Sequence, residues 1–383
     1  MTMDKPGLNT ICTHTGTLAD EQFKGTVSPL YMATSYAYED VAVKRYPRYF
    51  NTPNQAALAK KIAALEHAEE ALIFGSGMAA ISTALLALLK QGDHIAVQQS
   101  LYGGTFNLIT REFEKFGISF SFTKGIQPEA FEQAIQASTK VIYIETPSNP
   151  LLTITDLSAI AGMAKKRGII TVIDNTFASP VNQNPIDFGI DIVIHSATKY
   201  LGGHSDILAG AVAGPSVHIA RIYELAKSLG GSLSDYTAWL LERSIKTLGL
   251  RVDAQNRNAA ALATYLDRHP EVKKVHYPGL ESHPGHALAR SQMKGFGGML
   301  SFELEAGRDA MAFQRALKLV KPVMSLAGLE STIVIPAVTS HEKLSPAERL
   351  SQGITDNLLR LSAGIEDAED IIADIIQALS AIA

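Results

Sequence analysis

The chain has 383 residues, 46% of them hydrophobic, and this length indicates two domains with large buried cores. Its 38 acidic and 34 basic residues give a formal net charge of -4 and are spread along the chain, which argues against nucleic acid or a membrane surface as a partner. The single cysteine, Cys12, excludes an intrachain disulfide, so we expect a reducing, cytoplasmic location.

Residues 1–50 contain prolines, glycines and several tyrosines but no sustained helical or strand period. We expect this segment to be an arm without a core of its own that lies against a neighbouring subunit. The most apolar run of the chain, residues 79–89, is shorter than the roughly 20 residues that a membrane-spanning helix needs. We therefore expect no membrane-spanning segment.

Between residues 51 and 249, short apolar segments alternate with helical patterns, which is typical of an α/β domain with a mostly parallel sheet. The predicted strands are residues 71–74, 94–97, 118–122, 141–145, 169–173, 191–195 and 208–214, and helices are predicted at residues 78–89 and 157–167. Ligands of such sheets bind at the carboxyl ends of the strands, where polar residues also collect in this sequence.

Residues 250–383 show a different pattern, which predicts a smaller α+β domain. Its predicted helices are residues 254–268, 310–319 and 368–379, and its predicted strands are residues 273–278 and 297–304. His283 and His286 lie in this part, but neither further ligands nor an HExxH pattern accompany them. We interpret them as structural or solvated histidines and predict no metal site.

Lys199 is the most informative residue of the chain, because it follows an apolar strand within the run IVIHSATKYLGG. A lysine at a strand end can be partly desolvated, which lowers its pKa and leaves a neutral amine able to form a Schiff base. The hydroxyls of Ser196 and Thr198 could hold a phosphate beside it, and a lysine with a phosphate cradle is what pyridoxal 5'-phosphate (PLP) requires. The alternative for Lys199 alone is an ordinary surface loop.

Three other segments carry candidate residues, each with a plainer alternative. Asp174 ends a predicted strand and could contact a pyridinium nitrogen, or it could cap a turn. The segment FGSGM, residues 74–78, sits between a strand and a helix, where backbone N–H groups bind phosphate, although Gly-Ser-Gly turns are common. Tyr102 could stack on a flat cofactor ring and move a proton, or it could be a packing aromatic.

Six motifs together strongly resemble the PLP-dependent enzymes of cysteine and methionine metabolism, a family of cystathionine and methionine lyases, synthases and sulfhydrylases. They are FGSGM (74–78), LYGGT (101–105), ETPSNP (145–150), IDNTF (173–177), SATKYLGG (196–203) and RLSAGIED (360–367). The resemblance covers nearly the whole chain in the family's order. It implies the fold-type-I architecture, with a seven-stranded, mostly parallel sheet in the large domain, and PLP as the cofactor.

The resemblance also implies a role for each matching residue. Lys199 would carry the cofactor, Asp174 would contact its pyridinium nitrogen, and Tyr102 would stack on its ring. Asn149 would lie near its phenolic oxygen. Its phosphate would be held by four residues, Ser196, Thr198, Gly77 and Met78. For the substrate it implies Arg360 as the carboxylate-binding residue, with Ser325 and Met324 beside it. Tyr46 and Arg48 match residues that reach the phosphate of a neighbouring subunit, in a family that typically forms homotetramers of active dimers.

Several departures from the family pattern bear on the reaction. Pro47 replaces a serine of the usual motif, and Gly104 stands where typical methionine gamma-lyases have a cysteine. Met324 stands where the cystathionine-handling members have glutamate, which favours an apolar substrate arm. We expect a gamma-eliminating C–S lyase acting on methionine or cystathionine. The alternatives are a gamma-replacing synthase or sulfhydrylase, an aminotransferase of the same fold, and a non-catalytic oligomeric binding protein.

Overall fold

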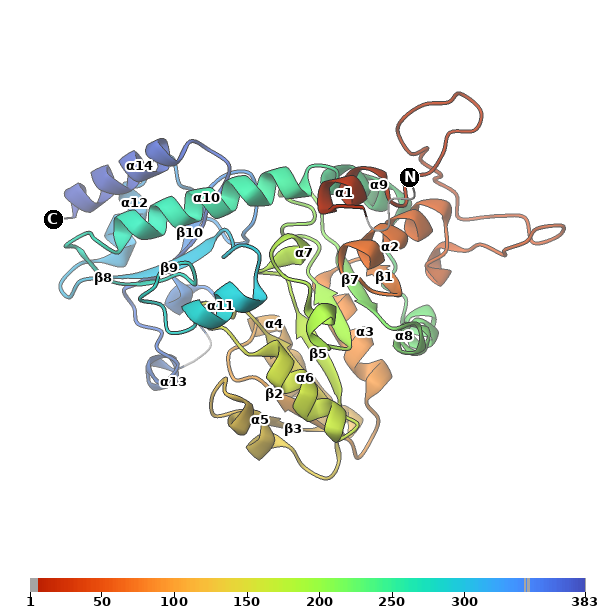
Figure 1. Cartoon of the computed structure of the whole chain (residues 1–383), viewed down its shortest axis with the longest axis horizontal. Coiled ribbons are helices and arrows are strands. Elements are labelled where there is room, and N and C mark those ends of the chain that lie inside the picture. The colour runs from red at the N-terminus through yellow and green to blue at the C-terminus, as the bar shows by residue number, and fades with distance from the viewer. Residues whose placement is uncertain (1–5, 341, 343–344, 383) are drawn as a thin grey trace.

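The computed structural model describes residues 6–340, 342 and 345–382, and within them the strands form one seven-stranded and one four-stranded sheet (Figure 1). The larger sheet contains β1 (Glu70–Phe74), β2 (His94–Val97), β3 (Ser119–Phe122), β4 (Thr139–Glu145), β5 (Ile170–Asp174), β6 (Ile192–His195) and β7 (Gly210–Gly214). Their order is β1-β7-β6-β5-β4-β2-β3, and β7 runs antiparallel to both of its neighbours. The predicted sheet of seven mostly parallel strands is confirmed.

Helices cover both faces of this sheet because its strands are apolar on both sides. The α-helices of this part of the chain are α2 (Pro53–Leu65), α3 (Gly77–Leu88), α4 (Gly103–Asn107), α5 (Pro128–Ala134), α6 (Leu157–Lys166), α7 (Ser179–Asn182), α8 (Ser216–Leu229) and α9 (Asp235–Ile245). One core joins Ile81 of α3 and Ile219 of α8 to Val172 of β5, and another joins Phe131 of α5 and Ile160 of α6 to the opposite face. The sheet is therefore the middle layer of three.

The smaller sheet is antiparallel throughout, with the order β10-β11-β9-β8. Its part of the chain contains α10 (Leu248–Leu266), β8 (Val272–His276), α11 (His286–Gln292), β9 (Met299–Leu304), α12 (Ala310–Ala316), β10 (Thr332–Val334), α13 (Pro346–Ser351), β11 (Leu358–Ser362) and α14 (Ala368–Ala381). Figure 1 shows α10 reaching from the larger sheet to the smaller one, so this helix crosses the predicted domain boundary at residue 250.

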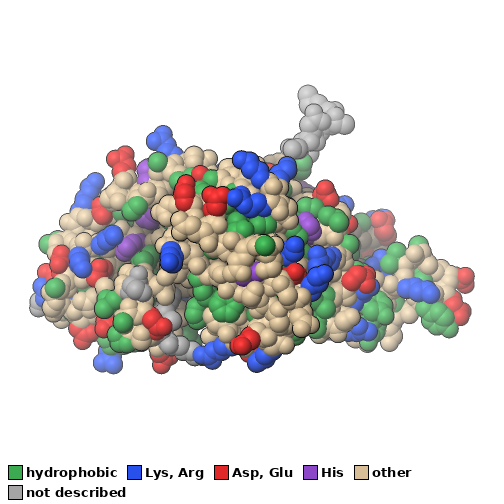
Figure 2. All heavy atoms as spheres, turned by 90° about the horizontal axis from the view of Figure 1, so that it is seen from below, with side chains coloured by type: hydrophobic (Ala, Val, Ile, Leu, Met, Phe, Trp, Pro, Cys, Tyr) green, Lys and Arg blue, Asp and Glu red, His purple; other side chains and the backbone are tan. Residues whose placement is uncertain are grey.

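The described part of the first fifty residues contains an α-helix that the sequence analysis missed, α1 (Leu8–His14). Its buried residues, Ile11 and Cys12, join the core formed by α2, α9 and α10, so the start of the predicted arm packs on its own chain. Beyond α1 the segment projects from one end of the molecule, where Figure 2 shows apolar side chains on its surface. Phe23, Met32 and Tyr38 are all at least 69% exposed there.

Candidate active site

A cavity of about 650 Å³ lies at the carboxyl ends of the central strands of the larger sheet, and residues of the C-terminal part close its other side. Most of the predicted site residues line it: Gly77, Met78, Tyr102, Asn149, Asp174, Ser196, Thr198, Lys199, Met324, Ser325 and Arg360. Tyr46 and Arg48 are not among the described residues that form its wall. The structure thus brings together residues that are separated by up to nearly three hundred positions in the sequence.

Lys199 lies just beyond β6, and its Nζ donates a hydrogen bond to the hydroxyl of Ser325 at 3.0 Å. Burial, and then the positive charge of Arg360, lower the pKa of Lys199, while Asp174 opposes the shift. Ser325 has a φ of 85°, a left-handed conformation that is uncommon for residues other than glycine. The site therefore contains an amine that loses its proton more easily than an exposed lysine does, which is what a nucleophile or base requires.

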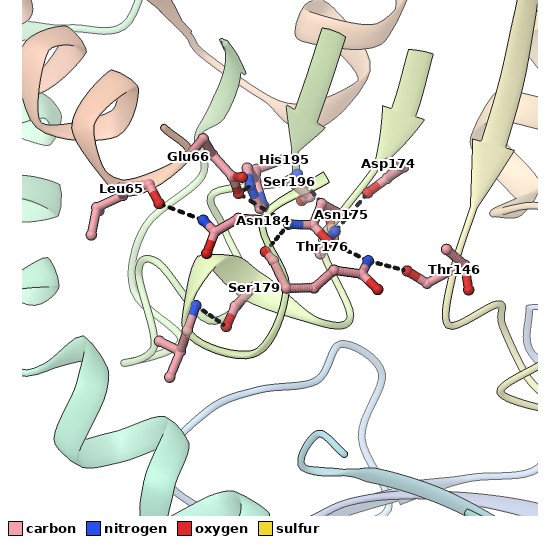
Figure 3. A network of polar contacts seen from close by, with 12 residues as sticks. Leu65, Glu66, Thr146, Asp174, Asn175, Thr176, Ser179, Asn184, His195 and Ser196 are labelled. Atoms are coloured by element: carbon pink, nitrogen blue, oxygen red, sulfur yellow. Dashed lines mark hydrogen bonds and ion pairs between the residues drawn. The ribbon is translucent and has the colours of Figure 1, made fainter. Parts of the chain in front are cut away.

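Asp174 ends β5 and is buried, and one of its carboxylate oxygens accepts the backbone N–H of Thr176 at 3.0 Å. Burial raises the pKa of Asp174, and this effect is opposed by the hydrogen bonds from Thr176 and by the charges of His195 and Lys199. Figure 3 shows His195 paired with the buried Glu66 close to this strand end. The amide of Asn175 donates a second hydrogen bond to the same Glu66 oxygen.

An anion-binding corner lies where α3 begins. Gly77 and Met78 are the first two helical residues, so their N–H groups have no acceptor within the helix, and Ser76 caps the helix by accepting the N–H of Ala79 at 3.0 Å. A Cβ on Gly77 would lie 2.8 Å from the Cβ of Ser196. Only glycine therefore lets the helix approach the Ser196 hydroxyl this closely. Thr198 lies nearby, with its hydroxyl bonded to the backbone of Ala209.

Arg360 lies in β11 and is buried against the cavity. Its Nη1 donates to Oδ1 of Asn149 at 2.8 Å, and its Nη2 donates to the carbonyl oxygen of Ser325 at 3.4 Å. Its Nε is buried without a hydrogen-bond partner among the residues that the structure describes. A buried donor without a partner is costly, so this guanidinium is suited to bind a carboxylate that enters the cavity.

Tyr102 and Met324 lie where the cavity meets solvent, and they are 48% and 75% exposed. The Tyr102 ring occupies the space that a side chain at residue 104 would need, because a Cβ on Gly104 would lie 2.5 Å from the ring atom Cε1. Glu145, at the end of β4, also lines the cavity, although the sequence analysis gave it no role. Its signal was the same as that of Asp174, an acidic residue that ends a buried strand.

The comparisons with known proteins decide the family. The family model described as Cys/Met metabolism PLP-dependent enzyme matches residues 9–380. The chain belongs to this family. Cystathionine gamma-lyase and Cystathionine beta-lyase MetC, both from Bacillus subtilis, are each 43% identical to it, over 97% and 94% of this chain and 98% and 93% of theirs. L-methionine gamma-lyase from Fusobacterium nucleatum is 40% identical over the full length of both chains.

Solved structures agree with the family. A cystathionine gamma-lyase from Lactobacillus plantarum complexed with L-serine matches with a TM-score of 0.95 and 42% identity, covering 98% of this chain and 99% of that one. The predicted family, fold class, enzymatic nature and cofactor are thereby confirmed, and the predicted C–S lyase class agrees with these relatives. The roles of the individual site residues stay predictions.

The cavity fits PLP on observations of its own. The N–H groups at the start of α3 and the Ser196 hydroxyl form a corner for a phosphate, and Asp174 offers a buried carboxylate on the sheet side. Lys199 reaches the same cavity with an amine of lowered pKa.

None of the helices in the described part of the chain has both the length and the apolar composition that spanning a membrane requires.

Proposed function

We propose that the chain is a PLP-dependent C–S lyase that eliminates the γ-substituent of a sulfur amino acid, methionine or cystathionine, to give a 2-oxo acid, ammonia and a thiol. The observation that carries this proposal is one cavity that combines Lys199, Asp174, Tyr102 and Arg360. An amine, a ring-nitrogen partner, a proton donor and a carboxylate clamp are the groups that this elimination needs.

Each of these residues has a separate role in the proposed elimination. The bound cofactor supplies an electron sink for the negative charge that develops on the substrate. Arg360 holds the substrate carboxylate, and its free Nε completes a two-pronged grip with Nη2. The Lys199 amine, with its lowered pKa, takes the α-proton, and the Tyr102 hydroxyl donates a proton to the leaving sulfur. Asp174 keeps the ring nitrogen of the cofactor protonated.

Two features bear on the substrate. Met324 places an apolar side chain at the mouth of the cavity, which favours an apolar arm such as that of methionine. Gly104 argues against methionine, because typical methionine gamma-lyases carry a cysteine at this position. Here the Tyr102 ring fills the space that a cysteine side chain would need. Beta-elimination from cystathionine is a second candidate reaction, because the 43% identical MetC from Bacillus subtilis is a cystathionine beta-lyase.

The test supplies purified protein with PLP and gives it methionine, cystathionine, or O-acetyl-homoserine with cysteine, in separate reactions. We expect 2-oxobutyrate from methionine or from cystathionine. Pyruvate and homocysteine from cystathionine would indicate beta-elimination instead. Fast thioether formation from the homoserine ester, with slow 2-oxo acid release, would contradict the lyase proposal and indicate a gamma-replacing synthase or sulfhydrylase.

We also propose a homotetramer built from active dimers, in which Tyr46 and Arg48 complete the cavity of a neighbouring subunit. Tyr46 is 43% exposed, and Arg48 donates a hydrogen bond to the backbone carbonyl of Lys227, which like Arg48 is not among the described residues that line the cavity of its own chain. A cytoplasmic location belongs to the same proposal, since the single cysteine is a free, buried thiol.

A further inference from the structure

The floor of the cavity contains a second buried carboxyl that the proposed reaction leaves unused. Glu145 and Asp174 end neighbouring parallel strands and are directly opposite each other in the register of β4 and β5. They are 4% and 7% exposed, and both line the cavity. Two adjacent buried carboxyls repel each other when both are ionised. A second carboxyl at this position is therefore unfavourable unless its side chain makes contacts that compensate for the repulsion.

The carboxyl of Glu145 lies between the two loops that carry predicted cofactor contacts and is hydrogen-bonded to the first of them. Its Oε2 accepts the backbone N–H of Tyr102 at 2.8 Å, and Tyr102 lies on the loop after β2. The backbone N–H of Asn149, on the loop after β4, lies close enough to this carboxyl to lower its pKa. The Gln98 amide donates to the backbone carbonyl of Glu145 at 2.7 Å, which fixes where the side chain starts.

The length of the side chain, rather than its charge, accounts for these contacts. Burial, and then the nearby Asp174, raise the pKa of Glu145 to about 8, which favours the protonated form of its carboxyl. A protonated carboxyl still accepts an N–H bond through its carbonyl oxygen. Burial also raises the pKa of Asp174, and the hydrogen bonds from Thr176 and the charges of His195 and Lys199 oppose that shift.

We propose that Glu145 is a positioning residue of the PLP site, which holds the Tyr102 ring in place by accepting the backbone N–H of Tyr102 and which lies against the backbone N–H of Asn149 on the next loop. This inference rests on the proposed cofactor contacts of Tyr102 and Asn149. It assigns the strand-end carboxyl a task that neither the elimination chemistry nor the packing of the sheet requires.

Two substitutions of Glu145 show whether the length of its side chain or its charge matters for the PLP site. Glu145→Gln keeps the side-chain length and an acceptor oxygen but cannot ionise, whereas Glu145→Asp keeps the acid and is too short to reach the backbone N–H of Tyr102. The readouts are the dissociation constant of PLP and the visible circular dichroism of the bound cofactor, which depends on a fixed ring environment. We expect both to stay close to wild type in Glu145→Gln, and PLP binding about tenfold weaker, with a reduced dichroism band, in Glu145→Asp.

The matched control is Glu242→Asp, the same shortening of a buried glutamate that pairs with Lys61 and Lys246 away from the cavity. It should leave PLP binding unchanged even if the melting temperature falls. If Glu145→Asp does not fold, Glu145→Met takes its place, because methionine keeps the side-chain length and removes the acceptor oxygens. It should show the same weaker PLP binding and the same reduced dichroism band.

The inference would be overturned if Glu145→Gln lost as much PLP affinity as Glu145→Asp, or if none of the Glu145 variants lost PLP affinity. The failure of the proposed function is a separate result, because wild-type protein would then bind PLP without turning over any sulfur amino acid, or would not bind it.

Discussion

Lys199 and Asp174 show how burial acts oppositely on an amine and a carboxyl. Burial lowers the pKa of Lys199 and raises that of Asp174, so it disfavours the charged form of both. Their mutual attraction opposes both shifts, and Thr176 and His195 further oppose the shift of Asp174, which favours the ionised form that a pyridinium nitrogen needs. The amine with lowered pKa and the supported carboxylate are the two residue-scale conditions for the proposed chemistry.

Replacing Lys199 by alanine should abolish turnover without unfolding the chain. The amine takes part in proton transfer, which contributes on the order of 10²–10⁴-fold to a rate, so we expect kcat to fall by at least about 10²-fold. The fold should survive because, among the described residues, the side-chain amine is bonded to the Ser325 hydroxyl alone. Turnover with a 2-oxo acid readout and a melting curve test this, with Lys140→Ala, an exposed lysine of β4, as the control. Full activity in Lys199→Ala would refute the proposed role.

At the scale of elements, the start of α3 is the feature that makes the anion corner. Its N–H groups face the cavity because Gly77 allows the helix to touch Ser196. The corner is therefore a property of how α3 packs beside the segment after β6, and neither element forms it alone.

Gly77→Ala should weaken PLP binding without removing the Lys199 chemistry. The new methyl group would press on Ser196 and push the helix start away from the phosphate, so we expect the dissociation constant of PLP to rise about tenfold. Gly162→Ala is the control, because a Cβ there meets no atom within 4 Å. Equal PLP affinity of the Gly77 variant and the control, measured by cofactor titration, would argue against this corner as the phosphate site.

The same elements show what the sequence could and could not predict. The strands of the larger sheet were predictable because they are buried on both faces and read as short apolar runs, and Asp174 and Lys199 stand out at their ends. β10 was missed because it has only three residues, and β11 because Arg360 interrupts its apolar pattern. α1 is a seven-residue helix held by packing on α2 and α10, which is tertiary information. The pairing of Glu145 with Asp174 required the strand register.

At the scale of the whole molecule, the projecting segment and its exposed apolar side chains lack a covering surface within the described chain. Phe23, Met32 and Tyr38 are exposed there, and Arg48 lies over the rings of Tyr46 and Tyr49, 5.6 and 5.3 Å from their centroids. An exposed apolar segment next to an arginine held by aromatic rings is suited to contact a second copy of the chain. This is the surface that the proposed active dimer would bury.

Complementation between subunits tests this arrangement. Arg48→Ala should weaken PLP binding, and Lys199→Ala should remove turnover, yet mixed oligomers of the two variants contain cavities in which both residues are intact. We expect activity to reappear on mixing, with each variant inactive or weakened on its own. Mixed oligomers that are proven by mass but show no recovery would contradict the shared cavity.

The most direct test of the central claim, that PLP reacts at Lys199 in this cavity, is to reduce the PLP-loaded protein with borohydride and map the modified peptide by mass spectrometry. The account predicts one major phosphopyridoxyl group, on Lys199, and its loss in Lys199→Ala. A label on another lysine, or an equal label on the variant, would contradict it.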